Sequence, residues 1–360
     1  TRVAPTLIRR VGHVRAFAFF TSAVACSVLL HEMWVSPWVW APVRLLTGIA
    51  MVGLYAIVES WLNSQAAPAQ RGRVFATYMG VNLGALALAQ QLLQVGDAGT
   101  HTLFVLAALL VCAAVMPVAA TRLSQPQIDN AAAPALRSLY RKAPIAFDAA
   151  FASGLAMGAF WGLGAVWADR SGLGSSGVAA FMSATIVGGA LFQWPLGMLS
   201  DRHDRGRVIT LVAFAAALLA LLPMFALPFG ADATATAGLL YGGFAFALYP
   251  MAMARLIDRL DPHEVLAGSS GLLLVHGIGA ALGPLAAGLA MAVLGPNALP
   301  MWFALTQGVL ALLTSSLLRR MPAQVALQTR FLPMVRTTST AFELAGTARP
   351  DPDTSTTETR

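Results

Sequence analysis

Charged residues and cysteines are scarce in this sequence. Asp, Glu, Lys and Arg make up 11% of the 360 residues, whereas 57% are hydrophobic. A soluble domain carries about 25% charged residues, and it cannot cover so much apolar surface. The two cysteines, Cys26 and Cys112, lie within apolar stretches and indicate neither a disulfide framework nor a metal site. The composition therefore excludes an ordinary soluble domain and favours a membrane protein.

Motifs for catalysis and nucleotide binding are missing as well. The sequence contains no Gly-rich phosphate loop and no His-Glu-x-x-His pattern, which disfavours an enzyme and an ATP-driven pump. The net charge is +7, but the arginines lie in short runs between apolar blocks and not on one solvated domain. We therefore expect no enzyme activity, no cofactor, no metal and no nucleic-acid partner.

Apolar residues gather in ten long segments. A helix of about 20 apolar residues spans the hydrocarbon core of a bilayer, and a helix pairs every backbone polar group within its own segment. We predict an all-α polytopic membrane protein, a monomer embedded in the lipid bilayer. The predicted segments are 16–31, 38–62, 74–94, 102–120, 143–167, 175–199, 207–228, 233–256, 265–293 and 299–318.

The connections between these segments alternate in charge. Every second connection is rich in arginine, whereas the opposite set contains Arg170 and no other Lys or Arg. Connections rich in Lys and Arg stay in the cytoplasm. This alternation predicts that residues 121–142 and the C-terminus are cytoplasmic.

An internal repeat relates two parts of the chain. A shift of 194 residues places Tyr55 on Tyr249 and Asn82 on His276, and the segment boundaries coincide as well. Two parallel halves are a known transporter architecture. Because the first half supplies four segments and the second six, we expect the first helix and most of the second helix of a twelve-helix, six-plus-six protein to be missing. The predicted division is 1–120, an incomplete N-terminal bundle; 121–142, a cytoplasmic central loop; 143–318, a C-terminal six-helix bundle; and 319–360, a disordered cytoplasmic tail.

The connection after the sixth segment, Gly197 to Val208, has the sequence GMLSDRHDRGRV. It resembles the signature loop between the second and third helices of each half in the major facilitator superfamily. Gly197 permits close helix approach, and Asp201 is followed by arginines that offer ion pairs. Arg202, Arg205 and Arg207 are candidate partners of Asp201, and we expect such charge pairs to hold the cytoplasmic side shut and to break when it opens. The equivalent loop at residues 7–17 contains no Asp.

Further stretches resemble the same superfamily. Arg44 and Gly48 match its fourth-helix motif, and Gly279, Gly283 and Pro284 match a Gly–Pro motif known best from antiporters. We interpret the latter three as helix-packing residues and a proline bend. Residues 58–63, 71–93 and 158–164 are similar to the YcaD-like bacterial group within the superfamily. The resemblance implies a transporter fold in a bacterial inner membrane, with no defined substrate.

Polar side chains inside the bilayer are candidates for function, because an intramembrane charge is costly. Arg44, Tyr55 and Glu59 share one helix face, which is expected to line a water-filled cavity. For Glu59 two interpretations stay open. It forms a gate-side salt bridge with Arg71 or Arg73, or it couples transport to protons.

Asn82 and His276 occupy matching positions in the two halves, and substrate sites lie near the midplane at the repeat interface. They are therefore the leading substrate candidates, and His276 is also a candidate for proton coupling. Packing residues remain the alternative for both. The other candidates for the translocation path are Tyr78, Tyr249, Trp161 and Gln193.

These observations predict a secondary active transporter of a small solute, working by alternating access and coupled to protons. A membrane sensor or interaction protein without transport activity is one alternative. A non-functional truncated fragment is another.

Overall fold

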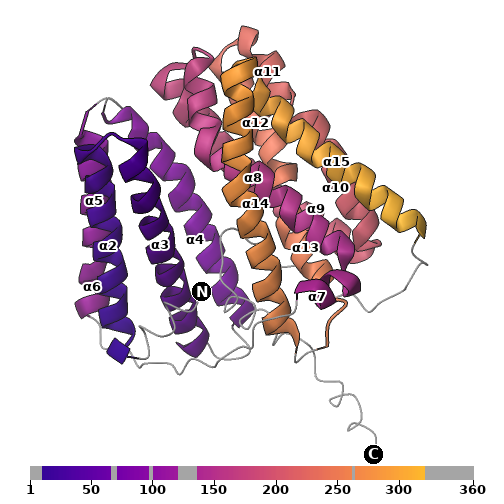
Figure 1. Ribbon diagram of the computed structural model, residues 1–360, viewed down its shortest axis with the longest axis horizontal. Helices are drawn as coiled ribbons and strands as arrows, with labels where there is room; N and C mark the ends of the chain where they lie inside the picture. Colours follow the sequence, from indigo (N-terminus) through magenta and orange to yellow (C-terminus); the bar gives the residue numbers. More distant parts are fainter. Residues whose placement is uncertain (1–9, 66–70, 97–99, 121–135, 262–263, 321–360) are drawn as a thin grey trace, which may run out of the picture.

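The computed structural model describes residues 10–65, 71–96, 100–120, 136–261 and 264–320 (Figure 1). Within these ranges the regular structure is helical, and no strand occurs. The predicted all-α fold is therefore confirmed.

The helices form two groups, which lie side by side in Figure 1. We call them the first and the second bundle. The first bundle contains α2 (His13–Met33), α3 (Pro37–Gln65), α4 (Arg71–Gln91), α5 (Thr102–Ala113) and α6 (Val115–Ala120). The second contains α7 (Leu136–Lys142), α8 (Pro144–Arg170), α9 (Gly174–Arg202), α10 (Arg205–Leu219), α11 (Leu222–Ala226), α12 (Ala231–Ala245), α13 (Leu248–Ile257), α14 (Val265–Leu294) and α15 (Ala298–Arg320).

All ten predicted segments are helical, and three of them are interrupted. In the described part of the chain, nine helical stretches are long and apolar enough to cross a membrane. Helix α4 is not among them, although it has 21 residues, because it carries polar residues such as Asn82. The interruptions, at residues 114, 220–221 and 246–247, each lie two to four residues before Pro117, Pro223 or Pro250. Proline lacks the N–H that would bond to the preceding turn, so the helix breaks there.

Two predicted boundaries need correction. The central loop was expected over residues 121–142, but residues 136–142 form helix α7, since LRSLYRK has a good helical composition. The tail was expected from residue 319, but α15 continues to Arg320. Residues 121–135 and 321–360 lie outside the described part of the chain.

The predicted repeat is visible in the helix boundaries. Helices α3 and α4 begin 194 residues before α12 and α14, respectively. Helix α2 is the counterpart of α10, and α5 with α6 is the counterpart of α15. The second bundle contains in addition α8 and α9, which precede this repeated set along the chain.

Glycines allow the closest contacts in the second bundle. A Cβ atom at Gly158 would collide with the backbone oxygen of Ala280, and one at Gly283 would collide with that of Leu155. Helices α8 and α14 therefore touch backbone to backbone. A Cβ at Gly242 on α12 would likewise meet the Thr185 carbonyl on α9. Such small-residue contacts replace the hydrophobic driving force that is absent between helices in lipid.

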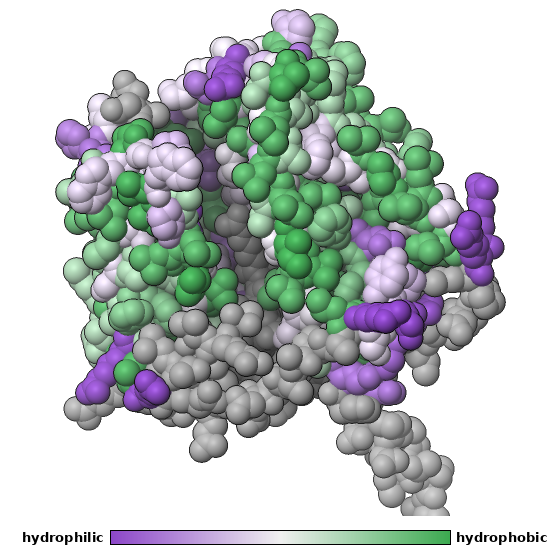
Figure 2. Space-filling view, viewed as in Figure 1, coloured by the Kyte–Doolittle hydropathy of each residue, from purple (hydrophilic) through white to green (hydrophobic). Residues whose placement is uncertain are grey.

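The outer surface of the helices is apolar, as the green areas of Figure 2 show. On α14, for example, Leu289 and Val293 are 71% and 82% exposed. In water such a surface would be unfavourable, whereas lipid tails cover it without cost. The exposed surface thus matches a chain whose helices are surrounded by lipid.

Candidate functional site

Polar side chains from both bundles come together where the bundles face each other. Glu59 lies on α3, Tyr78 and Asn82 lie on α4, Tyr249 lies on α13, and His276 lies on α14. We call these five residues the interbundle polar cluster. Two helices of each bundle contribute to it, so a rigid-body movement of either bundle would change its geometry.

Electrostatic and ring contacts connect the members of the cluster. The Glu59 side chain is fully buried, and its carboxylate interacts electrostatically with the phenols of Tyr78 and Tyr249. The ring centroids of Tyr249 and His276 are 4.4 Å apart. The Nδ1 atom of His276 lies 3.2 Å from the carbonyl oxygen of Ala150 on α8, which orients the imidazole. The cluster is therefore continuous across the boundary between the bundles.

Three polar atoms of the cluster are buried without a hydrogen-bond partner among the described residues. They are Tyr78 Oη, Asn82 Oδ1 and Tyr249 Oη. Buried polar groups are nearly always satisfied by protein or water, so such exceptions require an explanation. Tyr78 and Asn82 belong to the first bundle, and Tyr249 belongs to the second. Together they could receive the polar groups of a water molecule or of a solute held between the bundles.

The cluster lies nearer to one end of the helices. We call this end, where α3 ends and α4 begins, the basic end, because the arginine-rich connections lie there. Six residues separate Glu59 from the end of α3 at Gln65, which is about 9 Å at ~1.5 Å per residue. Asn82 lies eleven residues after Arg71, about 16 Å from the same end. The cluster therefore lies between the basic end and the middle of the helices.

The structure does not bring Arg44 to this cluster. Arg44 precedes Glu59 by fifteen residues, about 22 Å along α3. Its side chain is exposed and forms no ion pair or hydrogen bond within the described residues. Gly48 is exposed too, and a Cβ added to it would meet no atom within 4 Å. Tyr55 is half-buried and interacts electrostatically with Tyr78. The predicted face of α3 is therefore exposed around Arg44 and Gly48 and becomes buried toward Glu59.

Two other predicted residues lie on α8 and α9 of the second bundle. Trp161 packs edge-to-face against Phe160 and Phe246, in an aromatic group near the middle of α8. Gln193 is fully buried on α9. The roles of both in transport stay predictions.

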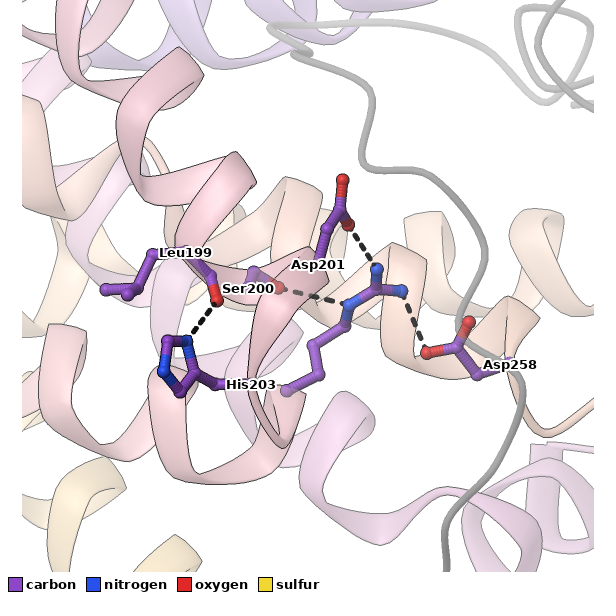
Figure 3. A network of polar contacts seen from close by, with 6 residues as sticks. Leu199, Ser200, Asp201, His203 and Asp258 are labelled. Carbon is purple, nitrogen blue, oxygen red and sulfur yellow. Dashed lines mark hydrogen bonds and ion pairs between the residues drawn. The ribbon is translucent and has the colours of Figure 1, made fainter.

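At the basic end of the second bundle, Arg205 organises the charged residues (Figure 3). Its guanidinium donates to Asp201 Oδ1 at 2.7 Å, to Asp258 Oδ2 at 2.8 Å and to Ser200 Oγ at 3.1 Å. The Arg205 side chain is only 1% exposed and that of Asp258 only 5%. Two carboxylates and a hydroxyl therefore satisfy a nearly buried cation.

A second pair extends this network. Arg255 on α13 lies 3.9 Å from the carboxylate of Asp204, which also accepts a hydrogen bond from the Arg207 backbone N–H and so caps α10. The Arg255 guanidinium packs against Gly206, where a Cβ would lie 2.8 Å from its Cζ. Gly206 is therefore required for this close approach.

The network partly differs from the predicted charge pairs. Asp201 pairs with Arg205, whereas Arg202 is exposed and forms no ion pair within the described residues. All the paired groups lie on α9, α10 and α13 or directly next to the ends of α10 and α13, so these bonds link helices of the second bundle and do not cross to the first. Gly197 is buried on α9. Arg73 is exposed, and the side chain of Arg71 lies outside the described part of the structure.

Sequence reasoning missed several members of this network. Asp258, Asp204, Ser200 and Arg255 were not predicted as gating residues. The spacing of Arg255 and Asp258, three residues apart at the end of a helix, was an available signal. Their partners on α10 are about 50 residues away along the chain, so only the fold reveals the pairing.

At the opposite end, the two bundles are joined directly by hydrogen bonds. Gln91 Nε2 on α4 donates to Ser183 Oγ on α9 at 2.6 Å, and Ser183 Oγ donates to the Ala87 carbonyl at 2.9 Å. Below them, Met79 and Leu83 of α4 are buried against the second bundle. The α4–α9 pair is therefore a continuous contact between the bundles.

Comparison with known families agrees with this arrangement. Residues 4–247 match the sequence profile of the Major Facilitator Superfamily. The chain belongs to the Major Facilitator Superfamily. The predicted family is thereby confirmed, and with it a multi-pass protein of the inner membrane. The members of the superfamily that this chain resembles are named as transporters.

Two relatives within the superfamily are similar over most of the chain. The MFS-type transporter Ent638_1421 of Enterobacter sp. (strain 638), itself uncharacterised, is 30% identical over 290 residues, which cover 79% of this chain and 74% of the relative. The MFS-type transporter YcaD of Escherichia coli O7:K1, also uncharacterised, is 29% identical over 286 residues, which cover 77% and 72%. The predicted likeness to the YcaD-like group is confirmed.

Solved structures share the fold. A mutant of the nucleoside transporter NupG superposes with a TM-score of 0.72 at 15% identity, covering 87% of this chain and 86% of NupG. FucP, the E. coli fucose:proton symporter, is similar as well; its structure in the outward conformation gives a TM-score of 0.51 at 15% identity, covering 89% of this chain and 86% of FucP. At this level of identity the likeness concerns the major facilitator fold alone.

Proposed function

We propose that this protein is a secondary active transporter that binds a small polar solute at the interbundle polar cluster and moves it by alternating access. The observation that supports this most directly is the convergence of five polar side chains from both bundles. Residues of this kind are costly inside a membrane and face a cavity or a partner. The basic end is proposed to be cytoplasmic, in accord with the distribution of arginine.

The contacts between the bundles suggest how access alternates. Gln91 and Ser183 hold the bundles together at the end opposite the basic end, in the proposed orientation the periplasmic side. Breaking these hydrogen bonds would let the bundles separate there, while the contacts of Met79 near the basic end stay closed. The Arg205 network would keep α9, α10 and α13 together, so that the second bundle moves as one body. Rocking of two rigid halves around a central site is the general mechanism of such carriers.

The chemistry of the cluster suggests both a coupling group and a solute class. We propose that the Glu59 carboxylate takes up a proton when the cluster opens to one side and releases it to the other. Its neighbours in the cluster are the phenols of Tyr78 and Tyr249, with the His276 imidazole next to Tyr249. Asn82 Oδ1 accepts hydrogen bonds, and the Tyr249 ring offers a flat apolar face. A neutral solute with hydroxyl or amino groups and a ring satisfies these groups, as a nucleoside or a hexose does.

The test uses the full chain in proteoliposomes with a pH-sensitive dye inside. Uridine and L-fucose are the first probes, because structural neighbours carry a nucleoside and fucose. We expect solute-dependent proton movement, and at least a tenfold loss of rate in Asn82→Ala and Tyr249→Phe. Tyr140→Phe is the matched control, since Tyr140 lies exposed on α7. Equal rates in Tyr249→Phe and Tyr140→Phe would remove the cluster from the solute path.

Glu59→Gln separates coupling from binding. If Glu59 carries the proton, this variant no longer accumulates solute against a gradient but still exchanges solute across the membrane. Accumulation that stays at the wild-type level would assign coupling to another group. No proton movement with any of a panel of nucleosides, hexoses and amines would contradict proton-coupled transport itself.

A further inference from the structure

An apolar groove runs along the membrane-facing side of the second bundle, between α10 and α15. Its volume is about 610 Å³, and Leu211, Phe214, Gly308 and Leu312 are among the residues that line it. Phe214 and Leu312 are 56% and 72% exposed. The groove exists because Gly308 and Ala217 face each other across it; a Cβ at Gly308 would still lie 3.8 Å from that of Ala217.

The length of the groove matches one leaflet of a bilayer. It extends along α15 from Gly308 to Leu318, ten residues that span about 15 Å at ~1.5 Å per residue. The hydrocarbon core of a bilayer is about 30 Å thick, so each leaflet contributes about half of it. The groove therefore begins near the middle of the membrane and opens at the basic end, at the depth of the lipid headgroups.

Cations surround that open end. Arg207 lines the groove itself, and Arg319 and Arg320 directly follow Leu318. All three side chains are exposed, and none of them forms an ion pair within the described residues. The carboxylates of the same region are already engaged: Asp201 and Asp258 bind Arg205, and Asp204 faces Arg255. The open end of the groove therefore carries positive charge that no described carboxylate neutralises.

We propose that this groove is a specific binding site for an anionic phospholipid of the leaflet at the basic end. One acyl chain fills the groove between α10 and α15, and the headgroup phosphate lies against Arg207, Arg319 and Arg320. Basic pockets between transmembrane helices on the cytoplasmic side bind such headgroups. An apolar helix of a second copy would fill the groove too, but it would leave the three cations without counter-charge. The site is independent of which solute is carried.

A second groove in the protein provides an internal contrast. It lies between α2 and α5, the repeat counterparts of α10 and α15, has a volume of about 320 Å³, and is lined by residues such as Cys26, Leu109 and Cys112. Among the described residues, none of those that line it is charged. A lipid chain that enters this groove therefore gains no headgroup contact, and we expect no selectivity between lipids there.

The test measures lipid retention by native mass spectrometry of the purified full chain. It is titrated with dioleoyl phosphatidylglycerol, which is anionic, and with dioleoyl phosphatidylcholine, which is neutral overall. We expect one phosphatidylglycerol to be retained at concentrations at least tenfold lower than phosphatidylcholine. Arg207→Ala should weaken phosphatidylglycerol retention about fivefold, since a basic residue near an anionic headgroup contributes about 1 kcal/mol, and should leave phosphatidylcholine unchanged.

Two further variants complete the test. Ser315→Phe places a ring in the groove and should weaken retention of both lipids. Arg170→Ala removes an exposed arginine at the opposite end and should change neither. Equal retention of the two lipids, or equal losses in Arg207→Ala and Arg170→Ala, would overturn the proposal. A change of oligomeric mass in Ser315→Phe with unchanged lipid retention would assign the groove to a second copy of the chain and would also overturn it.

Discussion

Related helices of the two bundles have different neighbours. In the second bundle, Gly242 of α12 and Gly283 of α14 press against backbone atoms of α9 and α8. In the first bundle, the counterpart of Gly242 is Gly48 on α3, which meets no atom within 4 Å. Helix α4, the counterpart of α14, rests on α9 of the other bundle instead. Helices α8 and α9, which cover Gly283 and Gly242 in the second bundle, have no counterpart among the described helices of the first bundle, so the face around Gly48 meets no other helix there.

The arginines of the two bundles also differ in burial. Arg205 in the second bundle is buried between two carboxylates, whereas Arg44 in the first bundle is exposed. A repeat in sequence therefore predicts which faces are shaped for close packing, but it does not predict which of them are occupied. In the chain of residues 1–360, we therefore expect stability to depend more on the contacts of the second bundle.

The largest effect is expected when the buried cation is removed. Arg205→Ala leaves Asp258 nearly buried without its partner and should cost about 3–5 kcal/mol. Arg44→Ala is the matched control and should change stability by less than about 0.5 kcal/mol. Thermal unfolding of the purified chain in detergent measures both. Similar melting temperatures for the two variants would contradict the difference between the bundles.

A smaller effect is expected from the glycine contacts. Gly283→Val forces α14 away from the Leu155 carbonyl, and overpacking of this kind costs about 3 kcal/mol. Gly48→Val meets open space and should stay within about 0.5 kcal/mol of the wild type. Melting curves of the two variants are the measurement. If Gly48→Val is as damaging as Gly283→Val, the face around Gly48 is occupied in the membrane and the comparison fails.

Loss of the hydrogen bond between the bundles should destabilise the protein less than loss of a glycine contact, but more than loss of an exposed ion pair. Gln91→Ala removes the hydrogen bond to Ser183, with an expected cost of about 1 kcal/mol. A double-mutant cycle with Ser183→Ala isolates the coupling between the two side chains, and Gln90→Ala serves as the neighbouring control. A coupling energy near zero would show that these residues do not join the bundles.

The smallest effect is expected at an exposed ion pair of the second bundle. Lys142 Nζ lies 2.6 Å from Glu264 Oε1, but the two side chains are 37% and 30% exposed. Water screens such pairs, so Lys142→Ala should cost only about 0.5 kcal/mol. Thermal unfolding measures this cost, and high salt should make the melting temperatures of Lys142→Ala and the wild type still more similar. A cost as large as that of Arg205→Ala would mean that burial does not distinguish the two pairs.

Much of the fold was predictable from the chain itself. Lipid forces each spanning segment to pair its own backbone groups, so apolar length alone identifies the helices. The prolines that interrupt α5–α6, α10–α11 and α12–α13 act locally, but their effect depends on whether neighbouring helices hold the segment straight. Pro284, for example, lies inside the unbroken α14. The interruptions were therefore not predicted.

The candidate site was predictable in part. Asn82 and His276 were singled out by their matching positions in the repeat, and the structure places both in the same cluster. Arg44 was grouped with Glu59 because helical periodicity gives the angle between residues around the axis, but it does not show how their surroundings change along it. The pairing of Arg205 with Asp258 joins residues 53 positions apart, and nothing local indicates it.

By itself, the sequence determined the membrane-spanning helices, the family and the sign of charge at each end, because these depend on composition and on short motifs. The tertiary structure alone decided which repeat-related faces are in contact, which arginine is buried and where the two bundles touch. Those outcomes depend on the position of helices far apart along the chain, and close packing tolerates only one arrangement of their backbones at a glycine contact.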